Sequence, residues 1–128
     1  MLRRVLVLVS VSVLSLAACS ESPQPAVDQE VRVETTRFFP SVVDVPLGGS
    51  VRWVNNLRDS AENIRTVTSG SGPEDSTAGA LFDVQLRGFA TGEPTGESFT
   101  YTFGERGTFT YFSRLPAGSE FTGTVRVQ

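Results

Sequence analysis

Hydrophobic and polar residues alternate in short runs along most of this chain. Val31 and Val33 stand between polar neighbours, and single polar residues separate Phe99, Tyr101 and Phe103. A repeat of two residues points hydrophobic side chains to one face of an extended strand and polar side chains to the other. The pattern therefore predicts β-strands that are each buried on one face.

Turn-forming residues separate these runs. Pro46 and the pair Gly48–Gly49 end one run, "GERG" separates two others, and "SGSGPEDSTAGA" is a long polar loop. No segment has the apolar repeat of an amphipathic helix of three turns. Seven or eight short strands, about 8 to 15 residues apart, predict an all-β antiparallel Greek-key β-sandwich. The aromatic residues expected to face inward are Trp53, Phe99, Phe103, Phe109 and Tyr111.

The first residues have a different pattern. Two arginines precede an apolar run from Val5 to about Leu16, and small residues follow in "LAAC", which ends at Cys19. This order is typical of a secretory signal, and the run is short for a transmembrane helix, which needs about 20 residues. "LAAC" resembles the bacterial lipobox, in which the cysteine becomes the lipidated first residue. An ordinary cleaved signal with a chance cysteine is the alternative.

We therefore expect three parts. Residues 1–18 are a lipoprotein signal peptide, residues 19–29 are a polar tether that is extended and flexible, and residues 30–128 form the sandwich. Lipid on Cys19 would hold the domain to a membrane outside the cytoplasm, in the periplasm or on the outer cell surface. No other cysteine is present, so no intrachain disulfide can form.

Composition excludes several classes of function. The chain has 11 basic and 14 acidic residues, and nine basic residues remain without Arg3 and Arg4. An acidic balance argues against binding to nucleic acid, which needs a basic surface. The chain has no histidine, so a serine–histidine pair is impossible and we expect no catalytic residues and no enzyme.

The order of the segments resembles that of the cupredoxins, and plastocyanin-like and pseudoazurin-like members are the most similar. The likeness rests on "FFPSVVDVPLGGSVRWVNN", "TVTSG", "LFD", "GESFTYTFGERGTFTYF" and "TGTVRV", and it extends over about residues 30 to 128. The resemblance implies a β-sandwich with a blue-copper centre. Such a centre needs a thiolate and two imidazoles, usually with a weak axial thioether.

At each position where the resemblance implies a copper ligand, this chain has a different residue. The chain lacks histidine, its single methionine is Met1, and Cys19 lies before the sandwich. We therefore expect no metal and no cofactor. The positions of the lost histidine, cysteine, second histidine and methionine are Arg65, Ser113, Pro116 and Phe121.

These replacements have two interpretations. In the first, the site is simply lost, Phe121 fills the core and Pro116 stiffens a loop. In the second, the site serves another use, with Arg65 paired to Glu120, to Glu62 or to loop carbonyls. The loops would then offer a partner surface made by Phe112, Leu115 and Phe121.

Two functions follow from the sequence. The first is a non-enzymatic binding or structural module on a membrane, with a possible protein partner in the cell envelope. The alternative is a copper-binding electron-transfer protein of the blue-copper family, as the fold alone would suggest. A calcium site at Glu74 and Asp75 is disfavoured, because "GPEDSTAG" lacks the ligand spacing that six or more oxygens would need.

Overall fold

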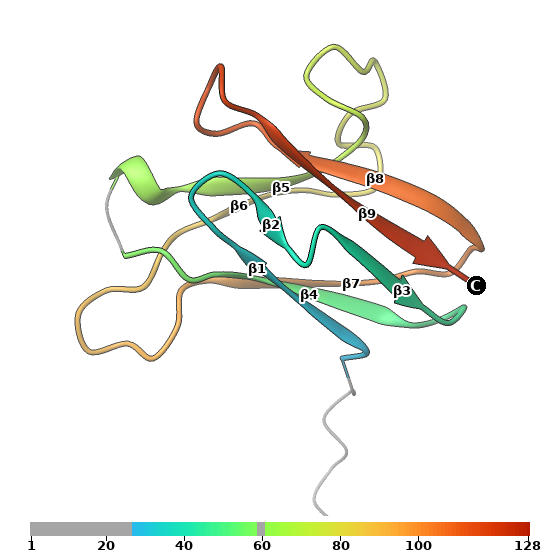
Figure 1. Ribbon diagram of the computed structural model, residues 1–128, viewed down its shortest axis with the longest axis horizontal. Helices are drawn as coiled ribbons and strands as arrows, with labels where there is room; N and C mark the ends of the chain where they lie inside the picture. Colours follow the sequence, from blue (N-terminus) through green and yellow to red (C-terminus); the bar gives the residue numbers. More distant parts are fainter. Residues whose placement is uncertain (1–26, 59–60) are drawn as a thin grey trace, which may run out of the picture.

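The computed structural model of the protein describes residues 27–58 and 61–128. The expected signal peptide, Cys19 and most of the tether lie outside these residues. The described part contains nine strands and one short 3-10 helix (Figure 1). They are β1 (Gln29–Val33), β2 (Phe38–Phe39), β3 (Val42–Val45), β4 (Ser50–Asn55), η1 (Ala61–Asn63), β5 (Arg65–Ser69), β6 (Asp83–Leu86), β7 (Ser98–Thr102), β8 (Gly107–Ser113) and β9 (Phe121–Val127).

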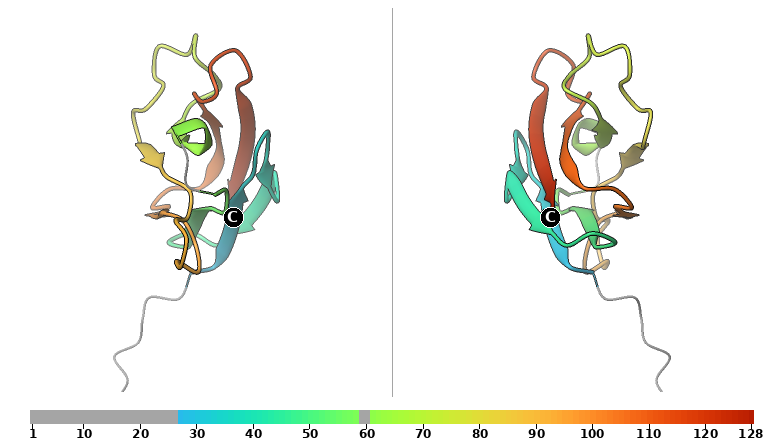
Figure 2. Two further views of the ribbon diagram at one scale, coloured as in Figure 1. Left: turned by 90° about the vertical axis from the view of Figure 1, so that its left-hand side faces the viewer. Right: turned by 90° about the vertical axis from the view of Figure 1, so that its right-hand side faces the viewer.

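The strands form two sheets that pack face to face (Figure 2). One sheet has the order β2-β1-β4-β7 and the other has the order β3-β9-β8-β5-β6. This confirms the predicted all-β sandwich, with one strand more than expected because Phe38–Phe39 pairs separately with β1. No helix in the described residues is long and apolar enough to cross a membrane.

Two strand pairings differ from the antiparallel expectation. β1 runs parallel to β4, and β3 runs parallel to β9. After β2 the chain crosses to the other sheet as β3, and the turn after Val45 brings it back as β4. Because β4 then runs in the direction of β1, their pairing is parallel. Alternation along a strand says which face is buried but not which way its neighbour runs.

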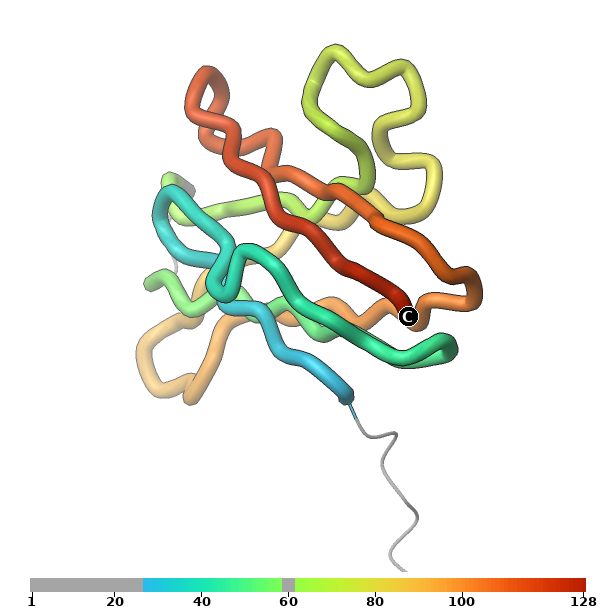
Figure 3. The backbone as a smooth tube through the Cα atoms, turned by 45° about the vertical axis from the view of Figure 1, so that its right-hand side comes forward, coloured from blue at the N-terminus to red at the C-terminus, as the bar shows by residue number. Residues whose placement is uncertain are grey.

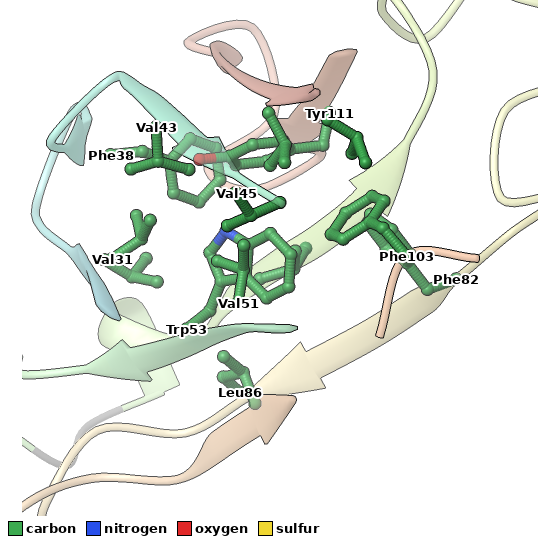
Figure 4. Packing of buried hydrophobic residues seen from close by; sticks show 14 residues of the cluster. Val31, Phe38, Val43, Val45, Val51, Trp53, Phe82, Leu86, Phe103 and Tyr111 are labelled. Atoms are coloured by element: carbon green, nitrogen blue, oxygen red, sulfur yellow. The ribbon is translucent and has the colours of Figure 1, made fainter. Parts of the chain in front are cut away.

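The core lies between the inner faces of the two sheets (Figure 4). Three of the five predicted aromatic residues, Trp53, Phe103 and Tyr111, are fully buried, while Phe99 and Phe109 are half-buried and pack against them. The Trp53 and Tyr111 rings meet edge to face with centroids 5.2 Å apart. Aromatic contacts of this kind add to the attraction that the buried aliphatic residues provide between the sheets.

Tyr111 is held in an unusually tight space. It pairs across the sheet with Gly123, and a Cβ atom at Gly123 would overlap the phenol ring. Only glycine lets the ring approach the backbone so closely. Burial raises the pKa of Tyr111 to about 12, although the nearby Trp53 indole opposes part of this shift. Because its pKa is raised, the phenol stays neutral at ordinary pH. The Tyr111 hydroxyl and the Trp53 N–H both lack a hydrogen-bond partner among the described residues.

The sandwich has two different ends. At the turn end, Asp28 N–H donates to Ser50, Leu47 N–H donates to Gln128, and Gly48 N–H donates to Phe103, all through backbone carbonyls. Figure 3 shows the β3–β4 turn, the β7–β8 turn and the C-terminus together at this end. The opposite end, the loop end, carries the β1–β2 turn (34–37), η1, the β6–β7 loop (87–97) and the β8–β9 loop (114–120).

Candidate functional site

The four residues that the sequence analysis predicts in place of copper ligands lie toward the loop end. β5 begins at Arg65, β8 ends at Ser113, and β9 begins at Phe121, which is paired with Ser113 across the sheet. Pro116 lies in the β8–β9 loop and is exposed. The fold therefore brings Arg65, Ser113 and Phe121 to neighbouring strands and leaves Pro116 in the connecting loop.

Arg65 is a buried cation, with only 3% of its surface exposed. Its Nε and Nη2 both donate to the Thr35 carbonyl, at 3.2 and 3.1 Å. Its Nη1 donates to the carbonyls of Glu62, at 2.7 Å, and Ile64, at 2.9 Å. Because Thr35 lies in the β1–β2 turn of the other sheet, the side chain connects the two sheets at the loop end.

The ion pair expected between Arg65 and Glu120 is not formed. No carboxylate of the described residues lies within 4.0 Å of the Arg65 guanidinium, and Glu62 accepts through its carbonyl. The acceptors are loop carbonyls, which the sequence analysis gives as the alternative partners of Arg65. Glu120 is exposed at the loop tip, where backbone N–H groups of Glu120 and Gly118 lower the pKa of its carboxyl. A solvated carboxylate has little to gain from moving to a buried position.

The Arg65 charge is fixed. Burial lowers the pKa of its guanidinium, but arginine starts from so high a value that it remains protonated in proteins. The guanidinium donates four hydrogen bonds to carbonyl oxygens, with N···O distances of 2.7–3.2 Å, and these dipoles do not cancel its charge. A second cation bound beside it would meet repulsion that the buried setting screens only weakly.

Ser113 is fully buried, and its hydroxyl is already in use. The Oγ atom accepts a hydrogen bond from Thr66 N–H at 3.0 Å and donates one to the Leu115 carbonyl at 2.7 Å. These bonds fasten the end of β8 to β5 and start the β8–β9 loop. A hydroxyl that donates to a carbonyl has no base to activate it, so the geometry does not make Ser113 a nucleophile.

A chain of hydroxyl groups lies beside Ser113, and sequence reasoning missed it. Thr66 Oγ1 accepts from Arg114 N–H at 2.8 Å and lies 3.1 Å from Thr68 Oγ1, which donates to Asp83 at 2.8 Å. Arg114 also reaches Asp83 at 3.5 Å. The alternating threonines of "RTVTS" were the available signal, since they occupy the face opposite to Val67. This network joins β5, β6 and the end of β8.

The expected partner surface needs a correction. Phe112 is 0% exposed, and the Arg114 guanidinium lies over its ring at 5.3 Å. Phe121 is half-buried and packs on Phe38, with ring centroids 4.8 Å apart, while Leu115 is half-buried. Phe112 lies outside the core cluster between the sheets, but the long side chain of Arg114 folds over its ring. Phe112 therefore cannot serve as a contact residue.

The residues at the four positions do not match a type 1 copper donor set. Arg65 offers only N–H donors, the Ser113 oxygen has two partners already, and neither Pro116 nor Phe121 has a side-chain donor atom for a metal. Within residues 27–58 and 61–128, no group of three or more histidine, cysteine or acidic residues could hold a metal ion. We therefore derive no chemical step through copper.

The acidic loop between β5 and β6 has a structural use for Asp75. Its carboxylate accepts hydrogen bonds from the N–H and hydroxyl groups of Ser71 and Thr77, at 2.7–3.2 Å. These bonds hold the pKa of Asp75 well below its usual range. Both carboxylate oxygens thus point at the loop itself, and the adjacent Glu74 is exposed.

Comparison with solved structures identifies the fold. An amicyanin from Paracoccus versutus (Thiobacillus versutus) superposes with a TM-score of 0.55 and 25% identity, covering 83% of this chain and 84% of the amicyanin. A purple cupredoxin from Nitrosopumilus maritimus gives 0.56 and 20% identity, covering 79% of this chain and 100% of that one. No family model matches the sequence.

A larger protein contains the same architecture. The copper-containing nitrite reductase from Thermus scotoductus gives a TM-score of 0.58 and 22% identity over 88% of this chain. The matched part is only 25% of that enzyme, so this chain spans about a quarter of its length. Likeness at this level of identity establishes a cupredoxin-like fold and leaves the function to the residues of the site.

Proposed function

We propose that this protein is a lipid-anchored, extracytoplasmic cupredoxin-like domain that lacks the copper site and works as a non-enzymatic binding or structural module. The observation that supports the proposal is the buried side chain of Arg65, the residue at the sequence position where the resemblance implies the first copper-ligating histidine. A permanent positive charge there is incompatible with holding Cu(II) at the same place.

The hydrogen bonds at the loop end support the same conclusion. In a blue-copper centre the metal joins ligands from separate strands and loops. Here Arg65 joins the β1–β2 turn to β5 and η1, and Ser113 joins β5 to the β8–β9 loop. Because protein groups make these connections, the loop end needs no metal to be ordered. The domain keeps the frame of the fold for a use other than electron transfer.

A module of this kind would act through its surface. The β8–β9 loop projects from the loop end, with exposed residues 116–120 and the half-buried Leu115 and Phe121 at its base. A protein of the cell envelope is the partner class that fits the proposed location. Because Phe112 is covered, substitutions in the exposed loop residues are the ones that should change the affinity for such a partner.

The membrane anchor is the second part of the proposal and rests on the sequence. "LAAC" provides the lipid-accepting Cys19, and eight residue steps separate it from Val27, the first described residue. Mass spectrometry of the protein purified from bacterial membranes tests this part. We expect a mass increase from acyl chains on the form that begins at Cys19, and release from membranes in Cys19→Ser.

The alternative is a copper protein in electron transfer, which is favoured by the likeness to amicyanin and to the copper-containing nitrite reductase. Adding Cu(II) to the purified, tag-free protein distinguishes the two functions. We expect no intense visible charge-transfer band and no stoichiometric copper after desalting. A stoichiometric blue or green centre would reject the proposal.

A positive control makes the negative result informative. The quadruple variant Arg65→His, Ser113→Cys, Pro116→His and Phe121→Met restores the ligand types at all four positions. If the frame of the fold is intact, this variant gains an intense visible band with Cu(II) while the unmodified chain stays colourless. Copper bound equally by both proteins would place the metal elsewhere and would count against the role given to Arg65.

A further inference from the structure

The turn end carries most of the exposed large hydrophobic side chains. Five such residues in the described chain are more than a third exposed, and three of them lie toward the turn end: Val27 at 38%, Leu47 at 46% and Leu81 at 48%. Leu81 belongs to a groove that contains the β7–β8 turn. The other groove residues are Tyr101, Thr102, Phe103, Gly104, Glu105 and Phe109.

Leu47 lies at the tip of a tight and well-fixed turn. Gly49 N–H donates to the Pro46 carbonyl at 2.8 Å, and Gly48 has a φ of 81°, which glycine adopts without strain. Two further bonds lock the turn from outside, from Leu47 N–H to Gln128 at 3.0 Å and from Gly48 N–H to Phe103 at 2.8 Å. The exposed leucine therefore lies on a rigid turn. Moving its side chain into an apolar phase would cost no further conformational entropy of the backbone.

The chain enters the sandwich beside this turn. Asp28 N–H donates to the Ser50 carbonyl at 3.1 Å, and the Asp28 carboxylate accepts from Ser50 N–H at 2.8 Å. Eight residue steps lead from Val27 back to Cys19. A chain of eight residue steps reaches at most roughly 30 Å. An anchor at Cys19 would therefore keep the turn end close to the lipid surface.

We propose that the turn end faces the bilayer, with Leu47 seated in the lipid interface, and that the loop end points away from the membrane. The inference rests on the proposed lipidation of Cys19. When rigid, exposed apolar side chains lie next to a lipid anchor, their transfer into the bilayer adds to the membrane affinity that the acyl chains provide. The lipid surface is the occupant because the predicted tether enters the sandwich beside the turn that carries Leu47.

The charges at the turn end define the kind of lipid contact. Asp28, Glu105 and Arg106 are exposed there, so the local balance is not basic. Attraction to anionic headgroups therefore contributes little, and the contact depends on the apolar side chains. We expect the orientation to be the same on zwitterionic and anionic vesicles and to be insensitive to salt.

Nitroxide labels on the lipidated protein test the orientation. Cys19 is the only cysteine and its sulfur carries lipid in the proposed form, so Arg106→Cys labels the turn end and Ala117→Cys labels the loop end. The labelled proteins are placed in phosphatidylcholine vesicles, and collisions with a water-soluble nickel complex are measured. The same labels on the soluble Cys19→Ser chain give the baseline. We expect a several-fold loss of accessibility at position 106 and none at 117.

A second pair of variants identifies the residue responsible. Leu47→Ser should restore accessibility at position 106, whereas Val42→Ser, which alters an equally exposed side chain at 46%, should not. Equal accessibility at both labels, or protection at 117, would overturn the orientation. Protection of 106 in the soluble chain at high concentration would assign the surface to a second copy and would also overturn it. A protein without lipid by mass spectrometry would reject the anchor and the orientation together.

Discussion

Arg65 has a larger structural role than its sequence position indicates. Its guanidinium makes four hydrogen bonds to the carbonyls of three residues, and no other side chain takes part. The sequence indicated that a buried cation needs acceptors, and it left both carboxylates and loop carbonyls as candidate partners. Carbonyl groups at the ends of turns and short helices are common unpaired acceptors, and their positions depend on the folded backbone. Which of the loop carbonyls accept from Arg65 could therefore not be predicted from residue types alone.

We expect Arg65→Met to lower the free energy of unfolding by about 3 kcal/mol, because the Thr35, Glu62 and Ile64 carbonyls lose a charged donor inside the protein. Urea unfolding measures the change as a lower midpoint at an unchanged slope. Arg106→Met is the matched control at an exposed arginine and should change the midpoint little. Equal effects of the two substitutions would contradict the role assigned to Arg65.

Gly123 is the second residue whose identity the structure explains. Gly123→Ala would place a methyl group inside the Tyr111 ring, and we expect a loss of about 2 kcal/mol or more from overpacking. Gly104→Ala is the control, because a Cβ atom there meets nothing within 4 Å. Thermal unfolding of both variants checks the prediction. A Gly123→Ala protein as stable as the Gly104→Ala protein would mean that Tyr111 moves aside freely.

At the scale of elements, alternation predicted most strands well because most of them have one buried face. The β9 burial pattern follows the sequence alternation from Gly123 to Val127. The pattern fails in three places with physical causes. β2 is only two residues long, β1 ends at Val33 before the alternation does, and Phe112 is buried on an outer face under Arg114. The parallel pairings depend on how the chain crosses between sheets, which no local pattern encodes.

The loop between β5 and β6 gives a prediction at the same scale. Hydrogen bonds from Ser71 and Thr77 lower the pKa of Asp75, so the folded state favours the ionised form. Stability from this carboxylate is complete above its ordinary pKa of about 4 and is lost as the pH falls toward the lower folded value. The stability difference between the unmodified protein and Asp75→Asn should therefore shrink between about pH 5 and pH 2.

Chemical denaturation across this pH range measures the effect. Glu74→Gln is the matched control, since it removes an exposed neighbouring charge without touching the bonds that order the loop. The difference in free energy of unfolding between Glu74→Gln and the unmodified protein should not shrink in this way as the pH falls. A pH-independent difference for Asp75→Asn would mean that the loop does not depend on the ionised carboxylate.

At the scale of the whole molecule, the fold and the site give different information. The sandwich, its inner aromatic residues and its likeness to copper proteins could be anticipated from the order of segments. The absence of histidine from the sequence was equally plain. The arrangement that stands in place of the ligands could not be anticipated, because it uses backbone groups of Thr35, Glu62 and Leu115. The function of the site therefore depends on those contacts and does not follow from the architecture.

The two ends of the molecule then have separate tasks in the proposed account. The turn end, with Leu47 beside the chain entry, faces the lipid, and the loop end, closed by Arg65 and Ser113, faces a partner. If both parts hold, substitutions at one end should leave the other unchanged. Leu47→Ser should not alter unfolding by urea as Arg65→Met does, and Arg65→Met should not change the accessibility of a label at position 106.

The most direct measurement is the copper content and visible spectrum of the full chain purified from cells grown with added copper. Elemental analysis and absorption are recorded on the same sample, beside the quadruple ligand variant prepared in the same way. The account predicts no stoichiometric copper and no intense visible band in the unmodified protein. One copper ion per chain together with a blue or green absorption band would contradict it.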